Sequence, residues 1–140
     1  MNTLLKTNRG FWKYFLLGII TLGIYPLYII HAFAKETNIA CEGDGQHTRG
    51  LLGVILLSLI TLGIYGIIWE YKIIERRNNY TIRNNMPSRL TGVLYLLTFF
   101  ILGQITLGIM HLVVLVKFLH QQNDVNQIHN SKIVQVAKQN

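Results

Sequence analysis

The sequence is poor in charge and in cysteine. Only 14% of its residues are Asp, Glu, Lys or Arg, and only 6 of the 140 are acidic. The single cysteine, Cys41, excludes a disulfide within the chain and says nothing about the compartment. A glycine-framed serine nucleophile, a glycine-rich phosphate loop and a pair of carboxylates facing a cleft are missing as well. These absences predict that the chain is not an enzyme and binds no cofactor.

Metal ligands are also scarce, apart from one loop. The residues there that could be drawn as ligands are Cys41, Glu42, Asp44 and His47. Their spacing matches no usual zinc pattern, and a glycine-containing loop is a poor template for a metal ion. We therefore predict no metal site.

What the chain does have is long uncharged apolar runs. Hydrophobic residues make up 51% of it, and the runs 14–34, 51–69 and 90–116 hold no formal charge when histidine is neutral. A run of roughly 18 or more apolar residues is long enough to cross the hydrocarbon layer as a helix. We therefore predict an all-α integral membrane protein. The alternative is a soluble oligomer of helices that are apolar on every side.

Basic residues flank these runs and account for the formal net charge of +7. A nucleic-acid binder would interleave them with aromatic residues on a polar face, so we predict no nucleic-acid partner. The flanking pattern instead predicts contact with a lipid bilayer that carries anionic headgroups, and residence in the inner (cytoplasmic) membrane, multi-pass or re-entrant. The first run resembles a signal peptide, but its pattern recurs at 51–69, where no leader can be. We expect it to be retained.

A motif of six residues is written three times. Ile-Thr-Leu-Gly-Ile-Tyr stands at 20–25 and 60–65, and a copy ending in methionine stands at 105–110. The match continues outside the motif. Five positions before the motif glycine lies a small residue (Gly18, Ser58, Gly103), and fifteen positions after it lies an asparagine (Asn38, Asn78, Asn123). The third copy holds about five extra residues before its motif.

This repetition predicts one membrane domain, 1–140, made of three tandem units. The units cover about 9–38, 49–78 and 89–123, and a polar C-terminal tail, 124–140, is expected to be mobile.

Each unit is expected to be a helix-turn-helix, or helical hairpin, which gives about six helices. The motif glycines Gly23, Gly63 and Gly108 can adopt the left-handed conformation that ends a helix. A single continuous helix that tolerates its glycine is the alternative. Hairpins are favoured because they give every copy of the motif the same surroundings.

The remaining repeated residues are expected to serve the turn. The hydroxyls of Thr21, Thr61 and Thr106 can bond a carbonyl one turn back or the open amides of the next helix. Tyr25 and Tyr65 can place a phenol near the turn. The small residues would let the two arms approach closely, and the asparagines are expected to end the second helix of each unit.

Three ionisable residues lie in or beside the apolar runs. His31 and His111 have either a structural role or a place along a polar pathway, and the sequence leaves this choice open. Glu70, which follows Trp69, is expected to pair with a neighbouring lysine or arginine.

Thr-Leu-Gly-Ile-Tyr-Gly-Ile-Ile-Trp at 61–69, followed by a basic helix that ends at Asn78, resembles a bacterial integral-membrane family known only as a domain of unknown function. Members of that family look like tandem runs of this unit. The resemblance is strongest over 49–79, clear over 9–38 and weaker over 89–123. It implies membrane residence in a bacterium and supplies no reaction, substrate or cofactor.

The sequence thus predicts a non-enzymatic, membrane-embedded interaction or accessory module. It would form a homo-oligomer or pack against another membrane protein through its small-residue faces. The alternative function is an oligomeric transport or permeation protein for ions or lipids, with the threonines and tyrosines lining a polar path.

Overall fold

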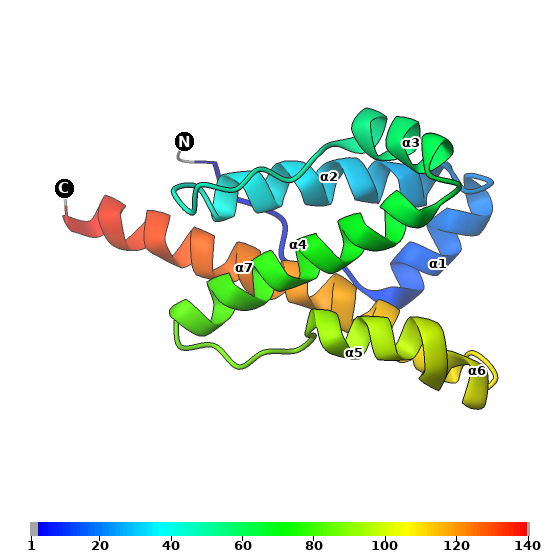
Figure 1. Ribbon diagram of the computed structural model, residues 1–140. Helices are drawn as coiled ribbons and strands as arrows, with labels where there is room; N and C mark the ends of the chain where they lie inside the picture. The colour runs from blue at the N-terminus through cyan, green and yellow to red at the C-terminus, as the bar shows by residue number, and fades with distance from the viewer. Residues whose placement is uncertain (1–2, 140) are drawn as a thin grey trace.

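The chain folds into helices. The computed structural model describes residues 3 to 139 (Figure 1). Its elements are α1 (Phe11–Ile20), α2 (Ile24–Ala40), α3 (Leu51–Ile60), α4 (Ile64–Arg83), α5 (Gly92–Leu97), η1 (Thr98–Leu102), α6 (Gly103–Ile105) and α7 (Ile109–Gln139). The π-helical segment η1 joins α5 to α6 without a break, so these three form one rod. Over the described residues the all-α class and the number of helices are confirmed.

Each apolar run folds back on itself at its motif glycine. The turns occupy 21–23, 61–63 and 106–108, and they separate α1 from α2, α3 from α4, and α6 from α7. All three turns lie at one end of the molecule, whereas both ends of the described chain, near residues 3 and 139, lie at the other (Figure 1). The helix-turn-helix arrangement is confirmed, and a continuous rod through each glycine is excluded.

The prediction of an integral membrane protein is wrong. No helix within residues 3 to 139 combines the length and the apolar character that crossing a membrane requires. The first arms, α1 and α3, have 10 residues each, which is about 15 Å of helix against a hydrocarbon layer of about 30 Å. The second arms are longer but become polar beyond their first half, as at Lys35 to Asn38. Because the glycine turn divides every apolar run, neither piece can span.

The core forms where the second helices of the three hairpins meet. Its main cluster contains Ile29 and Phe33 from α2, Trp69 and Ile73 from α4, and Leu119 from α7. The ring of Phe118 packs 5.5 Å from that of Phe33, measured between centroids. Phe33, Ile73 and Phe118 each stand ten positions after their motif glycine. Equivalent positions of the three units therefore meet at the centre.

The third unit accommodates its extra residues within a helix. In a π-helix each backbone amide bonds to the carbonyl five residues earlier, so a π turn accommodates an insertion without ending the helix. The segment η1 is such an insertion, and it lies between α5 and the motif. The rod starts at Gly92 because the side chain of Thr91 caps it, accepting a hydrogen bond of 3.2 Å from the Leu94 amide.

Two expectations about the helix ends are also wrong. The segment 124–139 is part of α7 rather than a mobile tail, and its first residues are buried because they pack against α2 and the N-terminal segment. The asparagines do not end their helices. Asn78 and Asn123 lie inside α4 and α7, and Asn38 lies in the last turn of α2, which ends at Ala40.

Candidate functional site

The three turns have the same backbone conformation. In each, a leucine and the motif glycine have positive φ angles, which are 51° and 89° at Leu22 and Gly23. The corresponding angles are 52° and 90° at the second turn and 50° and 88° at the third. Glycine adopts this left-handed region freely, but for other L-residues it costs about 1 to 2 kcal/mol. The glycine was expected from the sequence. The strained leucine beside it was not.

Hydrogen bonds close the first turn completely. The Gly23 amide donates to the Gly18 carbonyl at 2.8 Å, as in a Schellman helix end. The Thr21 hydroxyl donates to the Leu17 carbonyl at 2.6 Å and accepts from the Tyr25 amide at 2.9 Å. This threonine therefore makes both of the bonds considered possible from the sequence.

The second and third turns repeat this pattern with equivalent residues. Thr61 donates to Leu57 at 2.7 Å and accepts from Tyr65 at 2.9 Å. Thr106 donates at 2.7 Å and accepts at 3.1 Å in the same way, with Met110 providing the amide. The amides of Gly63 and Gly108 both donate at 2.7 Å to the small residue five positions back. One turn design therefore serves all three hairpins.

The small residues lie where the arms of each hairpin meet. A Cβ added to Gly18 would lie 3.8 Å from the ring of Pro26, and the Cβ of Gly66 would lie 3.5 Å from the hydroxyl of Ser58. The contact is much tighter in the third hairpin. There a Cβ on Gly103 would lie 1.8 Å from His111 Cε1.

The hairpin tips, which we define as residues 20–24, 60–64 and 105–109, present their apolar side chains to solvent. The turn leucines Leu22, Leu62 and Leu107 are 93%, 93% and 94% exposed. The isoleucines on either side of each turn are between 60% and 77% exposed; they are Ile20, Ile24, Ile60, Ile64, Ile105 and Ile109. No tip contains a charged residue. One end of the molecule is therefore an exposed aliphatic surface without charged side chains.

The opposite end buries polar groups. Arg9 and Glu36 form a bidentate ion pair with N to O distances of 2.5 and 2.6 Å, and their side chains are only 7% and 12% exposed. Next to the core, the guanidinium of Arg77, which is fully buried, lies 4.6 Å from the ring centroids of both Phe33 and Phe118. Polar side chains hold this end together while apolar ones face outward at the tips.

Asparagines connect one unit to the next. Asn38 accepts from the Thr48 amide at 2.8 Å and donates to its carbonyl at 2.9 Å, just before the second unit begins. Asn123 of the third unit binds both backbone groups of Arg9, at 3.1 and 2.7 Å, where the first unit begins. Asn78 makes no such pair, and its Oδ1 is buried without a partner among the described residues. The third unit is thereby joined back to the first.

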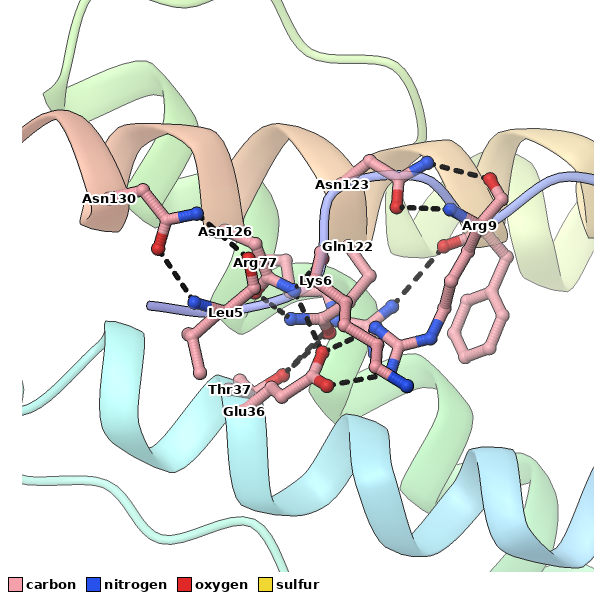
Figure 2. A network of polar contacts seen from close by, with 11 residues as sticks. Leu5, Lys6, Arg9, Glu36, Thr37, Arg77, Gln122, Asn123, Asn126 and Asn130 are labelled. Atoms are coloured by element: carbon pink, nitrogen blue, oxygen red, sulfur yellow. Dashed lines mark hydrogen bonds and ion pairs between the residues drawn. The ribbon is translucent and has the colours of Figure 1, made fainter. Parts of the chain in front are cut away.

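The N-terminal segment runs between α2 and α7, and asparagines of α7 hold it there (Figure 2). Besides Asn123, Asn126 donates to the Lys6 carbonyl at 2.6 Å, and Asn130 bonds to both backbone groups of Leu5, at 2.7 and 2.8 Å. The three asparagines follow one another at spacings of three and four, so they lie on one face of α7. The sequence analysis missed this signal because it treated the segment as a tail.

Arg76 forms hydrogen bonds to the linker 41–50, which joins α2 to α3. Its guanidinium donates to both carboxylate oxygens of Asp44, at 2.7 and 2.9 Å, and to Asn38 and Thr48. Burial alone would raise the pKa of Asp44, but the hydrogen bonds from Arg76 and from the Gln46 amide lower it overall. Asp44 is therefore a structural ion-pair partner. Within residues 3 to 139 no three metal-binding side chains gather at one place.

The other ionisable residues have separate places. His31 is exposed on α2, and His111 is exposed on α7 beside a central cavity. Glu70 forms no ion pair within residues 3 to 139, so the expected pairing with a neighbouring lysine or arginine is wrong, and Tyr95 lines the same cavity. Cys41 is buried at the end of α2 rather than exposed in a loop.

A known family model covers most of this architecture. The model for the domain of unknown function DUF4234 matches residues 9–52 and, separately, residues 49–124. The chain belongs to the DUF4234 family. Its first match covers the first hairpin, and its second match covers the other two. No curated protein and no solved structure matches the chain.

Proposed function

We propose that this DUF4234 chain is a non-enzymatic module that binds a lipid membrane from one side, with its three hairpin tips inserted among the lipids. The main support for this proposal is the exposure and backbone conformation of the three turn leucines. A side chain that is 93% or 94% exposed contributes almost nothing to folding, and the left-handed backbone of Leu22, Leu62 and Leu107 is unfavourable for leucine. Asparagine or glycine would fit this backbone better. An apolar partner outside the chain is the contact that explains leucine at all three turns.

The dimensions of the hairpins suit one leaflet. The 10-residue arms α1 and α3 measure about 15 Å, which is half of a hydrocarbon layer of about 30 Å. Insertion to this depth requires no helix to cross the membrane. It would bury the tips and leave the polar end of the molecule in water.

The residues at the base of the hairpins suit the headgroup region. Trp12 is 71% exposed in the first turn of α1, and Lys13 is exposed beside it. Arg49 and Arg89 are exposed just before α3 and α5. Tryptophan and long cationic side chains favour the boundary between headgroups and water, and cations favour anionic lipid. We place the module at the inner membrane of the cell on this basis.

The turn threonines argue against the alternative of a permeation protein. Thr21, Thr61 and Thr106 would have to offer their hydroxyls to a passing ion or lipid headgroup. Each hydroxyl already donates to one backbone carbonyl and accepts from one backbone amide. This supports a role for the threonines in shaping the tips.

Flotation with vesicles tests the proposal. The variant Leu22→Asn/Leu62→Asn/Leu107→Asn removes about 1.5 kcal/mol of apolar transfer per site, so its partitioning into phosphatidylcholine vesicles with phosphatidylglycerol should fall about a thousandfold. Its folding should not suffer, because asparagine tolerates the left-handed backbone better than leucine. Circular dichroism should show unchanged helix content and a midpoint of unfolding at or above that of the wild type.

The matched control is Leu4→Asn/Ile82→Asn/Val136→Asn, which changes three residues that are 64%, 54% and 56% exposed and lie outside the tips, in the N-terminal segment and near the C-terminal ends of α4 and α7. This control should float like the wild type. The proposal is wrong if the tip variant floats as well as the control. It is also wrong if the wild type ignores vesicles and the tip variant instead converts a lipid-free oligomer into a monomer, since the tips would then bind a second copy.

A further inference from the structure

A cavity of about 260 Å³ lies between the three hairpins. Every hairpin contributes to its wall: Tyr14 and Phe33 come from the first, Trp69 and Glu70 from the second, and Phe99 and His111 from the third. The wall is mainly aromatic and aliphatic. Few polar side chains interrupt it, which is the composition of sites that bind small organic molecules.

The third unit departs from the repeat where it lines this cavity. The π-helical segment η1 supplies Thr98 and Phe99, and His111 stands at the position that Pro26 and Gly66 occupy in the other units. Isolated π turns within α-helices occur frequently at functional sites. The turn design itself is the same in all three units, so these differences alter the cavity and leave the tips unchanged.

The polar side chains at the cavity lack the partners that a purely structural role would provide. The hydroxyl of Thr98, a residue only 1% exposed, has no hydrogen-bond partner in the described part of the chain. Glu70 forms no ion pair within residues 3 to 139. Burial raises the pKa of Glu70, against smaller opposing effects of Tyr95 and Arg77. A bound cation would favour the charged carboxylate, which burial disfavours.

The aromatic rings around Glu70 differ in what they can still bind. Phe33 and Phe118 already stack on the guanidinium of Arg77, which lies outside the cavity wall. Tyr14, Trp69 and Phe99 stack on no cation within residues 3 to 139. Trp69 donates its indole N–H to the Arg49 carbonyl at 2.8 Å, so the polar atom of this ring is already satisfied. Aromatic rings next to a carboxylate favour an organic cation.

We propose that the central cavity binds a small organic cation with an apolar body, such as an alkylammonium or arylammonium ion. The ammonium group lies against the Glu70 carboxylate and donates to the Thr98 hydroxyl. The hydrocarbon body fills the space between the aromatic and aliphatic walls. This site is separate from the tips, and its occupation requires no lipid.

A matched series of ligands tests the site. Octylammonium, octanol and octanoate share one alkyl chain and differ in charge, and each is used at neutral pH below the concentration at which it aggregates. Binding is measured without lipid, by calorimetry and by the fluorescence of Trp69, in a Trp12→Phe chain that also carries the three tip substitutions. Trp69 is then the only tryptophan, because the chain has 2. The tip substitutions remove the other apolar surface to which an alkyl chain would bind.

We expect octylammonium to bind at least tenfold more tightly than octanol, and octanoate to bind most weakly. Glu70→Gln keeps the shape of the side chain and should reduce the preference for the cation over octanol by tenfold or more. Ile30→Phe fills the cavity from α2 and should weaken the binding of all three ligands, with helix content unchanged.

Equal binding of octylammonium and octanol to the parent chain would overturn the proposal. An undiminished preference for the cation in Glu70→Gln would overturn it too. If Glu70→Gln does not fold, Thr98→Val takes its place and should weaken octylammonium more than octanol. Vesicle flotation compares the tips and ligand binding compares residues of the cavity, so either proposal can fail while the other stands.

Discussion

At the scale of single residues, Cys41 shows what burial does to reactivity. Its thiol is 2% exposed, and its pKa is raised from 9.0 to about 11, chiefly by desolvation. This pKa lowers the thiolate fraction at pH 8 about a hundredfold, and the thiolate is the reactive form. We expect a chromogenic disulfide reagent to react at least a hundredfold faster with the urea-unfolded chain than with the folded one. Equal rates would show that Cys41 is accessible.

The ion pair of Asp44 predicts how the stability of the fold depends on pH. Its pKa is lowered in the folded state, so the ion pair with Arg76 stabilises the fold fully above the unfolded value of 3.8. This contribution is lost as the pH falls through the folded pKa. We expect Asp44→Asn to lower the free energy of unfolding by about 1 to 2 kcal/mol at pH 7. The gap to the wild type should shrink below pH 3.8, and urea titrations at pH 7 and pH 3 check this. An equal gap at both pH values would contradict the assignment.

At the scale of elements, the same glycine-to-alanine substitution in two hairpins tests how closely their two arms approach. An alanine Cβ at Gly103 would meet His111 Cε1 at 1.8 Å and the Thr98 carbonyl oxygen at 2.7 Å, and the second contact is with backbone. We expect Gly103→Ala to cost about 1 to 3 kcal/mol of stability. The same substitution at Gly18 meets only the Pro26 ring, at 3.8 Å. Gly18→Ala should be neutral or slightly stabilising because alanine favours helix, and thermal unfolding of both variants decides this.

The sequence could predict the elements better than the way they pack. The repeated glycine and threonine were enough to predict the hairpins, because a left-handed residue and the hydrogen bonds that cap a helix are local features. The function of Asn123 depends instead on Arg9, which is 114 residues away in the chain, and no local pattern reports that pairing. The same limit applies to the central cavity. Glu70 follows Trp69 in sequence, but Tyr95 and Thr98, which line the same cavity, belong to another unit.

The hydrogen bonds of Asn123 to the N-terminal segment can be tested by substitution, with the equivalent residue Asn78 of the second unit as the control. Asn123→Ala leaves the buried backbone N–H and C=O of Arg9 without partners, and it should cost about 2 to 3 kcal/mol. Asn78 occupies the equivalent position, yet its Oδ1 already lacks a partner. Asn78→Ala should therefore cost less than about 1 kcal/mol. Chemical denaturation of the two variants measures the difference, and similar losses would mean that the Asn123 pair contributes little.

At the scale of the whole molecule, the polar end makes the three hairpins one closed unit. In an open array each repeat contacts only its neighbours, and terminal repeats can be removed while the remainder stays folded. Here α7 of the third hairpin packs against α1 and α2 of the first and α4 of the second. Its asparagines also hold the N-terminal segment (Figure 2).

Closure predicts how a shortened chain behaves. A chain that ends at residue 88 keeps two complete hairpins but loses Leu119 from the main core. It also loses the hydrogen bonds between Asn123 and Arg9 and the Phe118 ring that packs on Arg77. We expect it to lose cooperative unfolding, because the main core would lack Leu119 and the N-terminal segment would lack its hydrogen bonds to α7. Circular dichroism during heating should show a broad, weak transition for the shortened chain and a single sharp one for the full chain. A sharp transition in the shortened chain would indicate an open array, in which two hairpins form a stable unit without the third.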